Sequence, residues 1–174
     1  MKFGIAAILM LALTSALATP AAAQHQHAQS PYSGLQQREI KALSEQQMAD
    51  LRAGRGMGFA LAGELNGYPG PLHVLELADQ LQLTGPQRQR VQELFNAMKA
   101  EAVPAGEKLI RQESALDQAF AAQKISPASL ASLTARIGET TGQLRAVHLK
   151  YHLVTAKLLT AQQRQRYAEL RGYR

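Results

Sequence analysis

The chain has 174 residues, with 19 Lys or Arg against 13 Asp or Glu, a formal net charge of +6 and no cysteine. This length suffices for one domain with a modest core, and the absence of cysteine excludes disulfides as a source of stability. The positive charge alone would suit nucleic acid, an acidic protein or an anionic lipid surface.

The first 23 residues have the features of an export signal. Met1-Lys2 is a short basic end, an apolar stretch runs from Phe3 to about Ala18, and Ala21-Ala22-Ala23 supplies the small residues that cleavage requires. We predict a cut after Ala23 and a periplasmic mature protein. A retained transmembrane helix is the alternative, but the stretch is short for a span, so we expect no stable membrane insertion. Export also argues against nucleic acid as the partner.

Residues 24–40 are rich in Gln, Ser, Ala, Pro and Gly, which predicts a flexible tail. His25 and His27 lie in this tail beside the new amino terminus. They either bind copper or nickel loosely or are simply tail residues. We expect the helical domain to cover 41–174.

The domain begins with short helices. Ser44 stands three residues before Gln47, which is the spacing of a capping box, and predicts a helix that ends near Ala53. The glycines of 54–58 then interrupt it. Met57 lies between two of them, where regular burial is difficult, so we consider it a candidate contact for client proteins.

A second short helical piece is expected from Phe59 to Leu65. The sequence of 66–71, Asn-Gly-Tyr-Pro-Gly-Pro, is a strong turn signal. Pro71 can open the next helix, and apolar residues at helical spacing continue as far as Leu83.

Two long helices follow. An apolar stripe from Val91 to Phe120 predicts an amphipathic helix over 86–122, with a kink at Pro104 that would curve its surface. Residues 123–125 form the turn of a helical hairpin. Ser126 and Pro127 then open a second long helix, whose stripe runs from Leu130 to Leu158.

One pentapeptide pattern occurs twice. Leu83-Thr84-Gly85-Pro86-Gln87 recurs as Leu159-Thr160-Ala161-Gln162-Gln163. Each copy places Thr three residues before Gln, as in a capping box, so each copy predicts a helix start. The second copy begins a final helix that ends near Leu170. Strand signals are absent, and the fold class is all-α.

Two Leu-Thr-x-x-Gln motifs around a helical segment in an exported chain resemble the Spy/CpxP family of periplasmic helical proteins. The resemblance covers roughly Leu75 to Tyr173, and its motif residues are Leu83, Thr84, Gln87, Leu159, Thr160 and Gln163. It implies a helical hairpin with short flanking helices in a cradle-shaped homodimer. It also implies stress-linked activity, either as an ATP-independent chaperone or as a periplasmic heavy-metal sensor.

Histidine is the residue type that suggests a metal site. His148 and His152 are four residues apart on a predicted helix, so both side chains lie on one face and can share Zn, Ni, Co or Cu. His73 and Glu76 are three apart on an earlier helix and could add ligands. The alternative is that His148 and His152 are ordinary packed residues.

The carboxyl-terminal part is basic. Seven Lys or Arg and one acid lie between Arg145 and Arg174, and Arg164 and Arg166 are candidate contacts for acidic clients. The alternative is a solvated helix face that aids solubility. No catalytic constellation stands out, so we expect no enzyme and no required cofactor. The leading hypothesis is a homodimeric envelope chaperone or stress regulator that binds unfolded proteins or a periplasmic sensor domain. The alternative is a metal sensor or metal-binding resistance protein, and a purely structural envelope protein is the third possibility.

Overall fold

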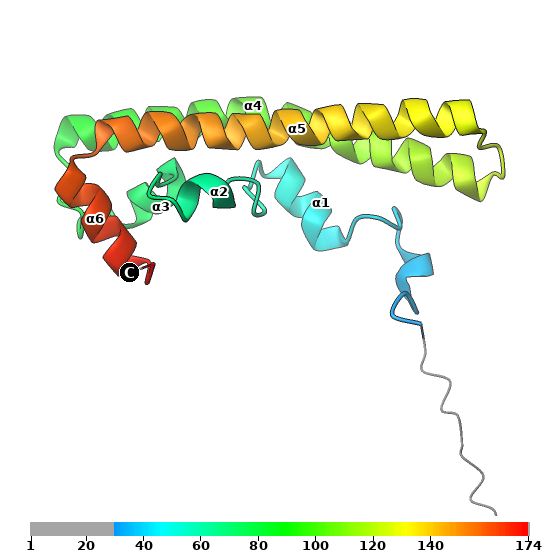
Figure 1. Ribbon diagram of the computed structural model, residues 1–174, viewed down its shortest axis with the longest axis horizontal. Helices are drawn as coiled ribbons and strands as arrows, with labels where there is room; N and C mark the ends of the chain where they lie inside the picture. Colours follow the sequence, from blue (N-terminus) through cyan, green and yellow to red (C-terminus); the bar gives the residue numbers. More distant parts are fainter. Residues whose placement is uncertain (1–29, 174) are drawn as a thin grey trace, which may run out of the picture. The chain divides into compact units, whose positions relative to one another are not determined.

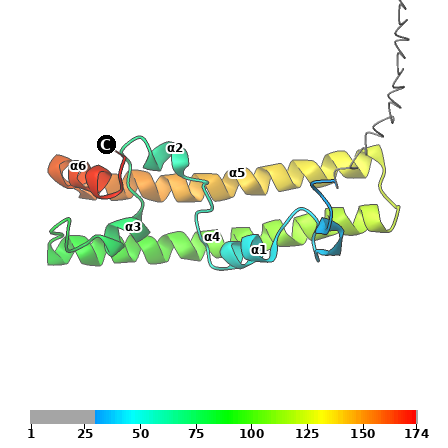
Figure 2. The same ribbon diagram turned by 90° about the horizontal axis from the view of Figure 1, so that it is seen from below.

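The computed structural model describes residues 30–173, so the predicted signal peptide, His25 and His27 lie outside the described residues. Two long helices, α4 (Gly85–Ala121) and α5 (Pro127–Leu158), pack side by side as an antiparallel hairpin (Figures 1 and 2). The part of the chain that the structure describes contains no β-strand. The all-α class and the long hairpin predicted from the sequence are therefore confirmed.

Short helices precede and follow the hairpin. The described residues from 34 onwards form one compact unit, and in Figure 1 the short helices lie on one side of the hairpin. They are the 3₁₀ helix η1 (Leu35–Gln37), α1 (Glu45–Arg52), α2 (Leu61–Glu64), α3 (Pro71–Glu76) and α6 (Ala161–Leu170). Ile40, which the sequence pattern placed in the tail, is buried against α1 and α4.

The helix starts follow the local sequence. Capping boxes begin α1, α4, α5 and α6, and in each one a hydroxyl accepts from the third helical N–H while the third side chain accepts from the cap N–H. The four capping residues are Ser44, Thr84, Ser126 and Thr160. The repeated motif therefore marks helix starts, as predicted.

The helix predicted from Pro71 to Leu83 is shorter than expected, since α3 ends at Glu76. Residues 77–82 form turns, and Gln82 has a left-handed backbone with φ of 51°. The Leu83 N–H donates to the Ala78 carbonyl at 3.0 Å, which closes this turn before α4 begins. Val74, Leu81 and Leu83 are buried and Leu75 and Leu77 are half-buried, but a chain reversal rather than a continuous helix brings Leu81 and Leu83 inside.

The region around Pro104 holds together although proline cannot donate a backbone hydrogen bond. Helix α4 continues through Pro104, so the proline does not end the helix. The proline ring is exposed. Two residues later, Gly106 lies under the end of α1. A Cβ at Gly106 would lie 2.5 Å from the Leu51 carbonyl oxygen, so the close approach of α1 and α4 requires glycine here.

The core is uneven along the hairpin. Buried clusters lie under α1, under α3 and α6, and between the first half of α4 and the second half of α5. No residue between 111 and 139 is buried. Phe120 and Leu130, which the sequence pattern placed on the apolar stripes, are 53% and 38% exposed. Among residues 30–173, no helix is both long enough and apolar enough to cross a membrane.

Candidate functional site: a pocket beside α2 and α3

The two copies of the repeated motif contact each other. Gln87 Nε2 donates to Gln163 Oε1 at 3.0 Å, and Gln163 Nε2 lies 3.1 Å from Gln87 Oε1. The same amide groups also donate to the backbone, from Gln87 to the Leu158 carbonyl at 2.9 Å and from Gln163 to the Leu81 carbonyl at 3.3 Å. The motif therefore joins the start of α4 to the start of α6 as well as capping both helices.

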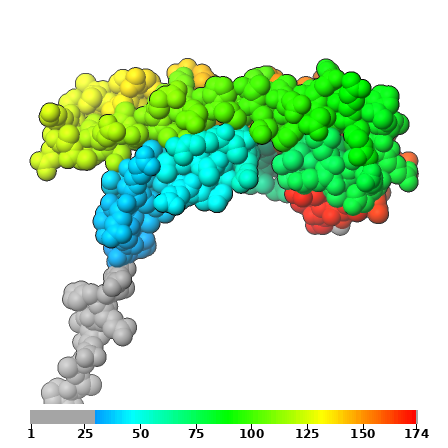
Figure 3. Space-filling view, turned by 180° about the vertical axis from the view of Figure 1, so that it is seen from behind, coloured from blue at the N-terminus to red at the C-terminus, as the bar shows by residue number. Residues whose placement is uncertain are grey.

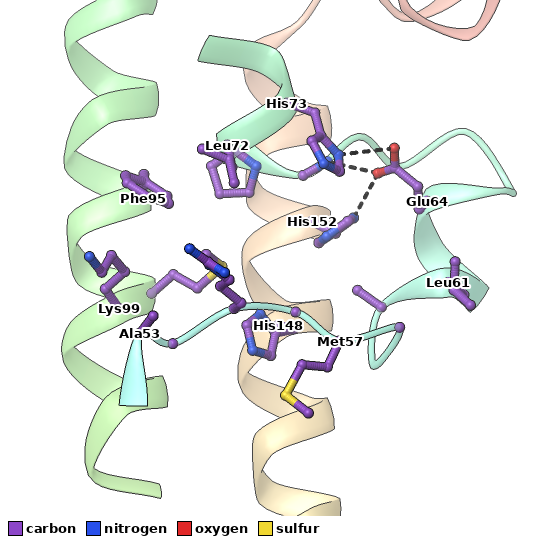
Figure 4. Close-up of a pocket in the computed structure, with 18 residues that line it drawn as sticks. Ala53, Met57, Leu61, Glu64, Leu72, His73, Phe95, Lys99, His148 and His152 are labelled. Atoms are coloured by element: carbon purple, nitrogen blue, oxygen red, sulfur yellow. Dashed lines mark hydrogen bonds and ion pairs between the residues drawn. The ribbon is translucent and has the colours of Figure 1, made fainter. Parts of the chain in front are cut away.

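A pocket with a volume of about 530 Å³ lies next to this joined end of the hairpin. Helix α4 contributes Phe95, Met98 and Lys99 to its lining, and α5 contributes His148 and His152. The remaining walls come from residues 53–64 and from 70–73 at the start of α3 (Figure 4). Figure 3 shows a recess between α1 and the region of α3 on this face of the surface.

The lining is largely apolar, and several of its apolar side chains are open to solvent. Met57, Leu61 and Leu72 are 37%, 54% and 40% exposed. Met57 also has a left-handed backbone, with φ of 43°, between two glycines. A thioether on such a loop can adjust to occupants of different shape.

Two cations lie on the lining. Arg55 pairs with Asp50 at 2.8 Å. The Lys99 ammonium lies 5.8 Å from the centre of the Phe95 ring and has no carboxylate within 4.0 Å among the described residues. In Figure 4, Lys99 and Glu64 lie on opposite sides of the pocket. The α4 side of the pocket is therefore positively charged.

Glu64 is the centre of a buried polar cluster at the opposite wall. Its side chain is 6% exposed. The Tyr167 hydroxyl donates to Glu64 Oε1, the Tyr173 hydroxyl donates to the same oxygen at 3.1 Å, and the Gly70 N–H donates to Oε2 at 3.2 Å. The Arg171 guanidinium lies 3.8 Å from Oε1. One carboxylate thus joins α2, the start of α3, and α6 with the residues that follow it.

These contacts decide the ionisation of the cluster. Burial would raise the pKa of Glu64, but the hydrogen bonds from His73, Tyr167, the Gly70 N–H and Tyr173 together outweigh it and lower the pKa to about 2. Burial and the neighbouring carboxylate raise the pKa of Tyr167 far above its ordinary value. At neutral pH the cluster is an ionised carboxylate held by neutral hydroxyl donors.

The two histidines on α5 are buried and have different surroundings. His152 Nδ1 lies 2.7 Å from the Tyr68 carbonyl, which can only accept, so Nδ1 carries the proton. On the other side of the ring, a Cβ at Gly70 would lie 2.5 Å from His152 Nε2. His148 stacks on Phe59, and its Nε2 is buried without a hydrogen-bond partner. Burial, with a smaller contribution from His152, lowers the pKa of His148.

The residues considered for a metal site are only partly brought together. His73 Nδ1 and His152 Nδ1 each lie 3.5 Å from Glu64, and His148 lines the same pocket. Glu76 is exposed and does not line the pocket. Both ring nitrogens of His152 face protein groups, and no three His, Asp or Glu side chains within residues 30–173 form a group that could hold a metal ion. The present arrangement does not fit a shared metal ion.

The three candidate contacts for client proteins do not lie at one site. Met57 lines the pocket, whereas neither Arg164 nor Arg166 does. Arg164 Nη1 donates to the Leu159 and Ala156 carbonyls at 2.6 and 3.1 Å, so its charge stabilises the end of α5. Arg166 is exposed and lies 3.4 Å from Glu169. Charge reversal at Arg164 would therefore disturb the fold as well as any client contact.

Sequence reasoning did not identify Glu64 or Lys99. Glu64 is an acidic residue within a short, largely apolar segment. The sequence alone does not show whether such a residue is buried, because burial of its charge depends on hydrogen-bond partners elsewhere in the chain. Those partners, Tyr167 and Tyr173, are more than 100 residues away in the sequence. No local sequence pattern distinguishes Lys99 from other lysines, because its role depends on the residues that lie across the pocket.

Comparison of the chain with protein-family models, with curated proteins and with solved structures found no match. The resemblance to the Spy/CpxP family accordingly stays a prediction.

Proposed function

We propose that the protein binds exposed apolar segments of non-native proteins in the periplasm, without ATP. The observation that carries this proposal is the open apolar pocket of about 530 Å³ between α4, α5 and the segment from α1 to α3. Pockets of this size accommodate drug-sized ligands, and this one has exposed apolar side chains at its edge. The predicted export signal and the resemblance to periplasmic chaperones also support this proposal.

The physical basis is capture by apolar contact with help from charge. Covering exposed apolar surface contributes about 25 cal/mol per Å² of area removed from water. A basic protein also attracts acidic, partly unfolded chains over longer distances. Neither effect requires nucleotide hydrolysis, and both allow many different sequences to bind.

The test is an aggregation assay with the purified protein. A chemically denatured acidic protein is diluted into buffer without ATP, and light scattering is followed with increasing amounts of the protein. We expect scattering to decrease at a near-stoichiometric ratio. Scattering equal to that with a folded basic protein of similar size would contradict the proposal.

Metal sensing is the second candidate, because His73, His148 and His152 line one pocket. Binding there would require these side chains to rearrange. The measurement is calorimetric titration with Zn, Ni, Co and Cu salts, comparing the wild type with the His148→Ala/His152→Ala double variant. Equal affinity in both proteins would exclude a metal site at these histidines.

The homodimer joined along the long helices also remains a proposal. Static light scattering at micromolar concentration tests it, and a monomeric mass would contradict it.

A further inference from the structure

We infer that the pocket selects a particular kind of client segment: an aromatic side chain next to an acidic residue, with the acid directed towards Lys99. This inference rests on the proposed function and specifies the segment that binds. It follows from the distribution of apolar and charged groups around the pocket.

The apolar part of the segment has a defined place. Phe95 and Met98 of α4 face the pocket, and Leu72 and Met57 stand at its edge. Sulfur atoms near an aromatic ring, and aromatic rings packed edge to face, are favourable contacts beyond simple area burial. A phenyl group therefore gains more from this lining than an aliphatic side chain of equal area.

The charged side chains around the pocket determine how a bound client segment is oriented. Lys99 on the α4 side has no acidic partner among the described residues, whereas Arg55 is already paired with Asp50. Across the pocket, both oxygens of Glu64 accept hydrogen bonds within the protein, so Glu64 offers no strong site to a cation. The unmet charge at the pocket is therefore that of Lys99, and it favours a carboxylate.

The size of this preference is limited by solvent. Lys99 is exposed, and ion pairs between exposed side chains are weak and screened by salt. We expect selection by charge to amount to roughly tenfold in affinity when two acidic residues are replaced by lysine. Most of the affinity should come from the aromatic side chain.

Three labelled peptides of equal length test the inference by fluorescence anisotropy with the purified protein. Their centres are Asp-Phe-Asp, Lys-Phe-Lys and Asp-Ser-Asp in an otherwise identical Gly-Ser chain. The first should bind best, the second about tenfold more weakly at low salt, and the third should show no measurable binding. Equal binding of all three would overturn the inference.

Two charge variants locate the effect. Lys99→Glu should remove the preference for the acidic peptide, whereas Lys108→Glu, an exposed lysine on the same helix outside the pocket, should leave it almost unchanged. Equal losses in both variants would show attraction by net charge alone and would contradict a site at Lys99.

The aggregation assay separates this inference from the proposed function. If the wild type suppresses aggregation but does not discriminate among the peptides, the selective pocket is wrong and the chaperone function stands. If it neither suppresses aggregation nor binds any peptide, both are wrong.

Discussion

The two ends of the helical hairpin differ in how they are held. At the clasped end, where the start of α4 and the end of α5 meet α3 and α6, the paired glutamines and the Glu64 cluster link distant segments. At the free end, residues 111–139, no side chain is buried and Phe120 is half exposed. Both ends carry apolar residues at the same helical spacing, so periodicity alone does not determine burial.

The difference comes from cover supplied by other parts of the chain. Helices α1, α3 and α6 bury the apolar stripes of α4 and α5 only where they lie on them. The free end has peripheral contacts: Lys41 Nζ lies 3.3 Å from Asp117 Oδ2, and Ile137 is only partly buried against the cluster under α1. Stability at the clasped end therefore depends on tertiary contacts. At the free end it depends on helix propensity and on the pairing of two helices.

The largest expected effect is at Glu64. Glu64→Ala removes the acceptor for Tyr167, Tyr173 and the Gly70 N–H, which leaves buried donors without partners. We expect a loss of about 3 kcal/mol in the free energy of unfolding, measured by urea denaturation. Hydrogen exchange should accelerate in α6 and leave 111–139 unchanged. An equal change at both ends would contradict the division into a clasped and a free end.

The same residue gives a pH dependence. The pKa of Glu64 is lowered from 4.5 to about 2, so its stabilisation is complete above pH 4.5 and is lost as the pH falls through about 2. Buried His148, with its lowered pKa, adds a loss that begins below pH 6.5, because unfolding lets it take up a proton. Glu64→Gln should abolish only the more acidic part of the curve. An unchanged curve would show that Glu64 is not ionised in the cluster.

Glycine substitutions should have opposite effects on stability under α1 and at the free end. Gly106→Ala places a Cβ 2.5 Å from the Leu51 carbonyl and should destabilise by about 2 kcal/mol, since α1 must move away. Gly138→Ala in the free end meets nothing within 4 Å and should stabilise α5 by up to about 1 kcal/mol. Thermal melts measure both, and stabilisation by Gly106→Ala would refute the close approach of α1.

The caps of the repeated motif should contribute moderately. Thr84→Ala and Thr160→Ala should each cost about 1 kcal/mol by loss of a helix cap. The losses in the free energy of unfolding caused by Gln87→Ala and by Gln163→Ala should not add up in the double variant, because the two side chains hydrogen-bond to each other. A double-mutant cycle by urea denaturation measures this coupling, with exposed Gln92 as the control site. Strict additivity would mean that the two motifs act independently.

The smallest effect is expected at the free end. Phe120→Ser and Leu130→Ser replace side chains that are 53% and 38% exposed, so each should change the free energy of unfolding by less than about 0.5 kcal/mol. Chemical denaturation is again the measurement. A loss of several kcal/mol at micromolar concentration would show that these residues are covered in solution, as in a homodimer along the long helices.

Local signals predicted most of the fold. Hydroxyl residues three positions before Gln marked helix starts at Ser44, Thr84 and Thr160, because a cap is an interaction within one turn. The end of α3 was missed, since a reversal at Gln82 brings Leu83 into the core and no glycine or proline announces it.

The candidate site was less predictable. The spacing of His148 and His152 correctly placed both on one helix, and the glycines around Met57 indicated an exposed loop. The partners of Glu64 and the position of Lys99 across the pocket arise from contacts between segments far apart in the sequence. No local pattern encodes such contacts.

Hydrogen exchange of the purified protein, with and without a denatured acidic client, tests the central claim most directly. If the pocket beside α2 and α3 captures clients, added client should slow exchange in 53–61 and 95–99 and leave 111–139 unchanged. Slower exchange confined to 111–139, or no change at a client concentration that prevents aggregation, would contradict the account.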